Sequence, residues 1–309
     1  MEVIGTVLLG LSETLEVKES QIRDNSSAEA LHDYRIAVRK TSSLLAQLDG
    51  VLPEPGLSRF RKEFSMITKR TGPVRDLEVC FSALTTYSQE MPGNNFTAFI
   101  QYVGKRERTQ RNRVLRSYRS KKYLAFKHDW QAYIQDTVEN ERSVISVQSI
   151  AREAVHRSYL KTIELSRKTC RRGTTKSFHK LRKSCKRLRY LLDIFRDLLS
   201  GEPRKKLVRK LKDLQGGLGR IQDMEVVLDF AGQFVGQPKD KLHKSDKKAV
   251  KNLVMKIKKE KQGLKADAAA LIGDFSATVA EEIDLLLGKS DKAVLAGMRS
   301  GTLSVEYRY

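Results

Sequence analysis

Apolar side chains recur at intervals of three and four residues along most of this chain. Residues 101–135, 150–170 and 245–285 show this spacing most clearly. It places apolar side chains along one side of an α-helix, whereas a half-buried β-strand would alternate apolar and polar residues. Such alternation occurs at residues 143–150 and 303–309, and the first of these stretches fits a helix equally well. The pattern predicts an all-α fold.

The chain also contains an internal repeat. Residues 31–84 align without a gap on residues 178–231 when the sequence is shifted by 147 positions. The identical pairs include His32 and His179, Arg35 and Arg182, Leu44 and Leu191, Leu45 and Leu192, Gly72 and Gly219, Asp76 and Asp223, Glu78 and Glu225, and Val79 and Val226. Two unrelated helices would share leucines but not also histidine, glycine and aspartate. The repeat predicts a single module of two antiparallel helical bundles, about 1–145 and 146–309, related by a pseudo-twofold axis.

In the second half, a helix with two chemically different sides is predicted after Thr174–Ser177, whose hydroxyl groups can cap its first turn. At about 100° per residue, cationic side chains gather on one side and apolar side chains on the other. The cationic side holds His179, Arg182, Lys183, Lys186, Arg187 and Arg189. The apolar side holds Leu181, Cys185, Leu188, Leu191, Leu192 and Phe195. One face should therefore pack in the core while the other presents positive charge.

The first half repeats this helix with fewer cations, after a capping box at Ser26–Glu29. Its polar side holds His32, Arg35, Arg39 and Lys40. Its apolar side holds Tyr34, Val38, Leu44, Leu45 and Leu48. Ser42 occupies the position that Arg189 has in the second half, so the first cationic side is predicted to be thinner.

Charge is distributed unevenly in this chain, which has 59 Lys and Arg residues against 37 Asp and Glu and a formal net charge of +22. Eleven basic and no acidic residues lie between Leu165 and Leu192, and Lys105–Lys127 contains ten basic residues against Glu107 alone. A merely solvated helix face usually mixes both signs, because like charges repel one another. Cations at this density favour a polyanionic ligand.

A further repeated segment, Thr71–Val79, combines glycine with acids. Gly72 followed by Pro73 predicts that one helix stops and another restarts there. Asp76 and its counterpart Asp223 are interpreted chiefly as caps or as structural ion-pair partners of a neighbouring helix.

These motifs together resemble the CHAD family, the conserved histidine α-helical domain. The resemblance rests on Leu31–Lys40, on Gly72–Val79 and on His179–Tyr190. The third segment is the most specific, with the pattern His-x-x-Arg-x-x-x-Lys-Arg-Leu-Arg-Tyr. The resemblance covers nearly the whole chain, because the domain consists of two helical-bundle halves, and it implies a basic central groove.

The resemblance also implies non-catalytic binding of inorganic polyphosphate in that groove and association with polyphosphate granules. The candidate ligands are His32, Arg35, Arg39, Lys40, Arg75, His179, Arg182, Lys183, Lys186, Arg187 and Arg189. Gln222 stands where the first half has Arg75, so full symmetry of the two halves is not expected.

Other functions are less well supported by the sequence. An enzyme would need carboxylates for Mg²⁺, but Asp76 and Glu78, two residues apart on a helix, point some 200° apart and cannot share one ion. No catalytic residue, metal site or cofactor is therefore expected.

RNA or another nucleic acid is the alternative ligand, since any phosphate backbone would release counterions. Single-strand binding usually adds stacking aromatics, and Tyr190 is nearly alone among the basic residues. A granule-coating scaffold that uses the lysines of Lys241–Lys265 is a third hypothesis.

The remaining signals concern the cellular compartment. Cys80, Cys170 and Cys185 are odd in number and lack metal-ligand spacing, which predicts reduced thiols in a cytoplasmic protein. Residues 3–11 are apolar but lack the flanking features of a secretory signal. No stretch approaches the roughly 20 apolar residues of a membrane span, so no membrane partner is expected.

Overall fold

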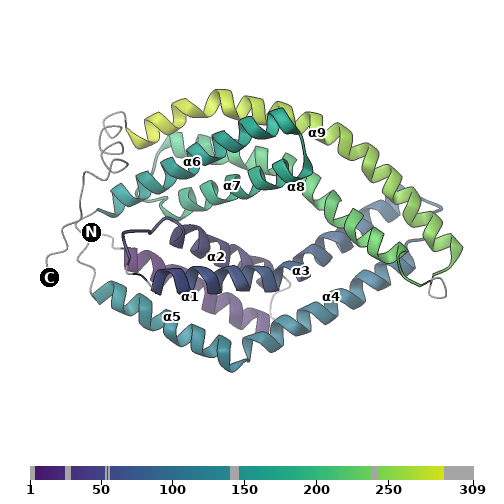
Figure 1. Ribbon diagram of the computed structural model, residues 1–309, viewed down its shortest axis with the longest axis horizontal. Helices are drawn as coiled ribbons and strands as arrows, with labels where there is room; N and C mark the ends of the chain where they lie inside the picture. The colour runs from purple at the N-terminus through teal and green to yellow at the C-terminus, as the bar shows by residue number, and fades with distance from the viewer. Residues whose placement is uncertain are drawn as a thin grey trace. The chain divides into compact units, whose positions relative to one another are not determined.

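The computed structural model describes residues 4–24, 29–52, 54, 56–139, 146–238 and 242–288. Within these ranges the chain is almost entirely α-helical and contains no strand, which confirms the predicted all-α fold (Figure 1). The helices are α1 (Ile4–Arg23), α2 (Ala30–Leu45), α3 (Gly56–Glu90), α4 (Thr97–Tyr118), α5 (Lys121–Glu139), α6 (Val147–Arg172), α7 (Thr175–Ile194), α8 (Glu202–Val235) and α9 (Lys244–Leu287). The alternating stretch near residue 147 is the first turn of α6, whereas residues 143–145 and 303–309 lie outside the described residues.

The chain divides into two compact units that are built from separate stretches of sequence. Unit 1 comprises Met1–Ser143 and Gly216–Ala269, and unit 2 comprises Val144–Gln215 and Ala270–Tyr309. The long helices α8 and α9 thus contribute residues to both units. The two units therefore do not coincide with the two halves of the sequence repeat. The pseudo-twofold relation of these halves stays a prediction.

The first part of unit 1 packs α1, α2, the start of α3 and α5 around a core of aromatic side chains. Phe64 of α3 meets Trp130 of α5 edge to face, with ring centroids 5.0 Å apart and planes at 78°. Phe60, one turn earlier, makes a similar contact with Trp130 at 5.0 Å. Edge-to-face pairs of this kind add about 0.5–1.5 kcal/mol to the stabilisation from apolar burial.

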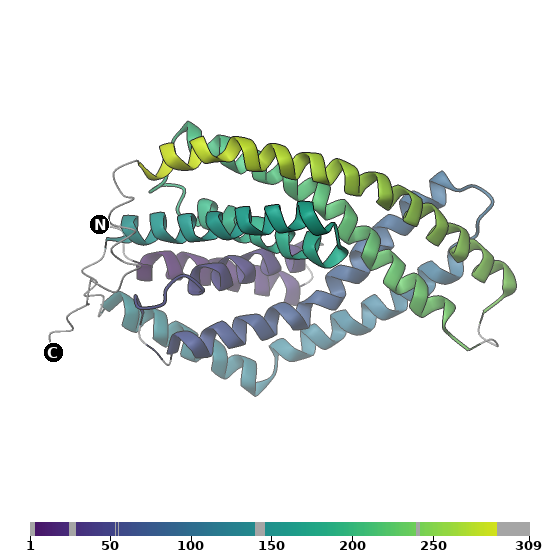
Figure 2. The ribbon, with the colours of Figure 1, turned by 45° about the horizontal axis from the view of Figure 1, so that its top comes forward.

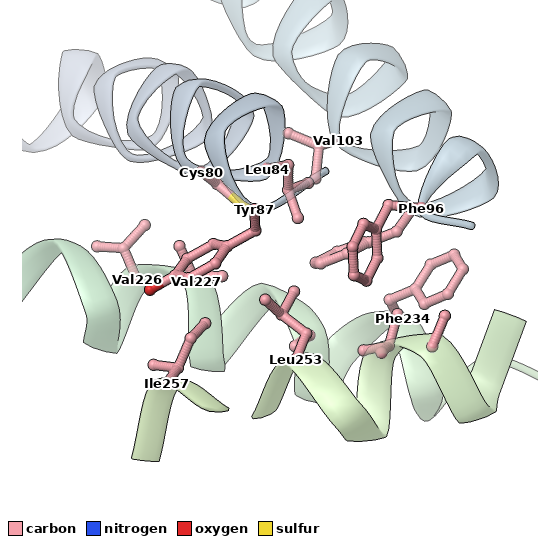
Figure 3. Packing of buried hydrophobic residues seen from close by; sticks show 14 of the residues in the cluster. Cys80, Leu84, Tyr87, Phe96, Val103, Val226, Val227, Phe234, Leu253 and Ile257 are labelled. Atoms are coloured by element: carbon pink, nitrogen blue, oxygen red, sulfur yellow. The ribbon is translucent and has the colours of Figure 1, made fainter. Parts of the chain in front are cut away.

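The second part of unit 1 packs the end of α3 and the start of α4 against the end of α8 and the start of α9. Figure 3 shows Leu84, Tyr87 and Val103 facing Val227 and Leu253 across this core. Polar contacts connect the same helices at the rim, where the Tyr87 hydroxyl donates a 2.7 Å hydrogen bond to Glu260. Segments that are more than 120 residues apart in sequence thereby form one core.

Unit 2 contains α6, α7, the start of α8 and the end of α9. Gly173, with φ of 55°, ends α6 in the left-handed conformation, and the Thr174 side chain accepts a hydrogen bond from the Ser177 amide to cap α7. This tight connection lays α6 and α7 side by side (Figures 1 and 2). The predicted cap at Thr174–Ser177 is confirmed, whereas most of the predicted capping box at Ser26–Glu29 lies outside the described residues.

The predicted helix break at Gly72 and Pro73 is wrong, because α3 runs without interruption from Gly56 to Glu90 and contains Pro73. A proline inside a helix removes one backbone hydrogen bond and costs about 3 kcal/mol. Here the Pro73 ring is exposed, while Ile67 and Val74 on the same helix remain buried. Continuous burial along α3 offsets the local cost, and the helix persists.

None of the described helices is both long enough and apolar enough to cross a bilayer.

Candidate functional site

Helix α7 has the two-sided character that its sequence predicts. Leu181, Cys185, Leu188, Leu191 and Leu192 are fully buried in unit 2. Small polar residues of α6 cover the flank of this face, where the hydroxyl groups of Thr162 and Ser184 lie 2.9 Å apart. The α8 residue Gln215 donates a 3.0 Å hydrogen bond to the Cys185 carbonyl oxygen. These contacts fix the orientation of α7 about its own axis. They therefore determine which of its side chains point outward.

The opposite side of α7 is cationic. Lys183 and Arg187 are exposed, whereas His179, Arg182, Lys186 and Arg189 are half-buried. Within the described residues, neither Lys183 nor Arg187 has an acidic partner. The Arg189 guanidinium lies 5.6 Å from the centroid of the neighbouring Tyr190 ring. Stacking on an aromatic ring holds a guanidinium in a defined orientation while its outer N–H groups stay available to a ligand.

The cationic surface continues onto the end of α6 and the start of α7. Exposed side chains without an ion pair among the described residues are those of Arg167, Arg171, Arg172, Lys176 and Lys180. The nearest carboxylate on α6 is that of Glu164, which is occupied by Lys161 and Lys168. This pairing on both sides holds the pKa of Glu164 down at about 2. The extended surface on α6 and α7 is here called the α6–α7 face.

In unit 1 the counterpart of Arg182 is buried rather than presented to solvent. Arg35 of α2 is only 7% exposed, and its guanidinium donates hydrogen bonds to Thr71 Oγ1 at 2.6 Å and to the Thr68 carbonyl at 3.4 Å. Burial and, to a smaller extent, the nearby positive charge of Arg39 lower the pKa of Arg35 to about 10, against the opposing effect of Asp76. Arg35 therefore ties α2 to α3 and supplies a positive potential from below the surface.

Helix α3 adds Arg75 to this cluster. Helices α2 and α3 pack against each other, and the charge of Arg75 contributes to the lowered pKa of Arg35. Arg75 lies 3.3 Å from the Glu78 carboxylate, and Arg111 of α4 lies 3.0 Å from the same carboxylate. Arg35, Arg39, Arg75 and Arg111 are here called the α2–α3–α4 cluster. Arg111 was not among the predicted ligands, although it falls within the cation-rich run of Lys105–Lys127.

The remaining predicted ligands of unit 1, His32 and Lys40, lie on α2 and are half-buried. The structure thus distributes the predicted ligands over two sets, one on α2 and α3 of unit 1 and one on α7 of unit 2. The shared basic groove stays a prediction.

Of the repeated carboxylates, the two glutamates form ion pairs with cations of their own unit. Glu78 lies between two arginines, and Glu225 lies 2.5 Å from Lys261 of α9. Among the residues that the structure describes, no three His, Cys, Asp or Glu side chains are grouped as metal ligands would be.

Comparisons with known proteins point in one direction. The family model described as CHAD domain matches residues 7–232 of this sequence. The crystal structure of the CHAD domain from the plant Ricinus communis aligns with a TM-score of 0.62 and 19% identity, over 94% of this chain and 90% of that one. PptA from Streptomyces chartreusis aligns with a TM-score of 0.59 and 13% identity, over 90% of this chain and 98% of that one. No match was found among curated protein sequences.

Proposed function

Because this chain belongs to the CHAD-domain family, we propose that it binds inorganic polyphosphate, without altering it chemically, through the α6–α7 face and the α2–α3–α4 cluster. The observation that carries the proposal is the two-sided burial of α7. One side is locked in the core, and the other presents cations of which Lys183 and Arg187 have no acidic partner among the described residues.

The chemistry of these side chains fits a chain of phosphates. Arginine can donate two parallel hydrogen bonds to phosphate oxygens, while the lysine ammonium acts as a mobile point charge. His32 and His179 can each donate a hydrogen bond and gain a proton when an anion approaches. A polyanion would relieve the repulsion between Arg35, Arg39 and Arg75 that lowers the pKa of Arg35. Cytoplasmic association with polyphosphate granules is part of the same proposal.

The first experiment compares two charge-reversed proteins of equal net charge. Lys183→Glu with Arg187→Glu removes two exposed cations from α7, and Lys258→Glu with Lys259→Glu removes two exposed cations from α9. We expect the α7 variant to lose at least about tenfold in affinity for long-chain polyphosphate, while the α9 variant stays within about threefold of the unaltered protein. Titration calorimetry measures the affinities, and circular dichroism checks that both variants keep their helicity.

The comparison of the α7 and α9 variants also shows which surface binds polyphosphate. Equal losses in both variants would show that net charge, rather than the α6–α7 face, governs binding. Loss confined to the α9 variant would favour the hypothesis of a scaffold that uses the lysines of Lys241–Lys265. Unaltered affinity in the α7 variant, and also in Arg182→Glu with Lys186→Glu, would refute the proposal for α7.

RNA is tested as the competing ligand on the same proteins. Binding to either polymer should weaken linearly on a log-log plot against salt, because counterions are released. We expect polyphosphate to displace RNA at about 0.2 M salt, since α6 and α7 carry no exposed aromatic side chain on which bases could stack. If RNA instead displaced polyphosphate, the preferred ligand would be a nucleic acid.

A further inference from the structure

A further cationic surface lies on the outer side of α4, outside the set of predicted ligands. It consists of Lys105, Arg108 and Arg116 of α4 and of Arg119, which caps the C-terminal end of the helix; all four are exposed, and the set is here called the α4 row. At about 100° and 1.5 Å per residue, these four side chains fall within an arc of about 80° and a length of about 20 Å. The buried residues Phe99, Val103 and Val114 lie on the opposite side of the helix. The row therefore points to solvent because of the same packing that buries the core side of α4.

The α4 row carries positive charge that no carboxylate in the described part of the chain neutralises through an ion pair. The one acid in the α4 sequence is Glu107, whose carboxylate accepts a 2.6 Å hydrogen bond from Arg111. None of the four row residues has an ion pair within the described ranges. Repulsion between such closely spaced cations costs stability, and a bound anion would remove that cost.

The row adjoins the α2–α3–α4 cluster. Arg111 approaches Glu78 of α3, which also binds Arg75, and Arg111 lies about 60° around the helix from Arg108. Unit 1 thus contains a series of cations that begins at the buried Arg35 and leads through Arg75 and Arg111 to Arg108. A chain held at the cluster would meet the α4 row next.

The chemistry of the row favours a ligand made of phosphates alone. No large apolar side chain of α4 is exposed, so the row lacks the groups that a membrane-surface helix inserts into lipid. Phe99 and Tyr118 are buried, and Arg106 covers the Tyr102 ring at 5.0 Å, so stacking surfaces for nucleic-acid bases are also missing on α4. Arginine and lysine are what remains, and both bind phosphate oxygens.

We propose that the α4 row is an additional docking surface for the polyphosphate chain, which continues there from the α2–α3–α4 cluster. This inference rests on the proposed function. It assigns to Lys105, Arg108, Arg116 and Arg119 the binding of chain segments that a short ligand does not reach. The protein would consequently hold long chains more tightly than short ones, because the second contact is made by the same molecule.

The test uses the full chain, tripolyphosphate as the short probe and long-chain polyphosphate as the long probe. Arg108→Glu with Arg116→Glu alters the row, and Lys258→Glu with Lys259→Glu provides the control of equal charge. We expect the row variant to bind the long probe at least about tenfold more weakly and the short probe within about threefold of the unaltered protein. The salt dependence of long-chain binding should also fall, by roughly 2 in log-log slope. The control should retain both the affinity and the slope.

The outcomes separate this inference from the proposed function. If the unaltered protein binds neither probe, the proposed function fails. If it binds long-chain polyphosphate and the α7 variant weakens, but the row variant keeps its full affinity and slope, only the α4 row is refuted. Loss of affinity for both probes alike would also refute it, because the row would then not distinguish long chains. Arg108→Lys with Arg116→Lys keeps the charge and should restore most of the long-chain affinity.

Discussion

Arg35 and Thr71 join α2 to α3 through a 2.6 Å hydrogen bond from a buried guanidinium to a buried hydroxyl. The Thr71 hydroxyl in turn donates to the Ile67 carbonyl oxygen at 3.0 Å. A cation that the repeat places among surface ligands thus also has a structural role. Its partner belongs to the segment that the sequence predicted to be a helix break.

Replacement of Thr71 tests this connection. Thr71→Val keeps the shape of the side chain but removes the acceptor of a charged donor, which should lower the free energy of unfolding by about 1.5–3 kcal/mol. Thr71→Ser keeps the hydroxyl and should lose clearly less. Urea denaturation measures both values, and equal losses would show that Arg35 does not depend on this hydrogen bond.

Two tyrosines of unit 1 provide a matched pair. The Tyr123 hydroxyl donates a 2.9 Å hydrogen bond to the buried Glu19 carboxylate and lies 2.8 Å from the Tyr34 hydroxyl. The Tyr133 hydroxyl is buried without a hydrogen-bond partner among the described residues. We expect Tyr123→Phe to lower the free energy of unfolding by about 1–3 kcal/mol and Tyr133→Phe to leave it unchanged or raise it. The reverse order in thermal denaturation would contradict this assignment of the buried hydroxyls.

The three cysteines should differ sharply in reactivity. Burial raises the pKa values of Cys80 and Cys185 to about 12, so near pH 8 almost none of either thiol is in the reactive thiolate form. Cys170 is exposed on α6. Iodoacetamide should therefore add one group to the folded protein, at Cys170, and three groups after denaturation. Mass spectrometry counts the adducts, and rapid modification of Cys185 in the folded state would show that α7 is not packed as described.

An added methyl group should have opposite effects on stability at two glycine positions. Gly10 lies inside α1 with no atom of a neighbouring element near the place where a Cβ atom would stand, so Gly10→Ala should stabilise the helix by about 1 kcal/mol. At Gly5 of α1 a Cβ atom would lie 2.6 Å from Val138 Cγ2 and 3.1 Å from the Val138 backbone. Gly5→Ala should therefore destabilise by about 1–3 kcal/mol. Denaturation midpoints that shift in the same direction would refute the packing of α1 on α5.

The sequence by itself determined the helices and the faces that they bury. Apolar spacing identified the residues of α7 that point inward, such as Leu181 and Leu188, because helical geometry is local and repeats every 3.6 residues. Local signals failed at Gly72 and Pro73. There the burial of residues along the whole of α3 outweighs the tendency of these two residues to end a helix.

Only the tertiary structure decided which distant segments share a core and which cations are free. The sequence does not show that Val227 and Leu253 pack with Leu84, that Arg35 is buried against Thr71, or that Glu78 lies between Arg75 and Arg111. These relationships depend on contacts between helices far apart in the chain, and a periodic pattern carries no information about which helix faces which. The positive charge was therefore evident from the residues alone, but the distinction between paired and unbalanced cations on α4 required the fold.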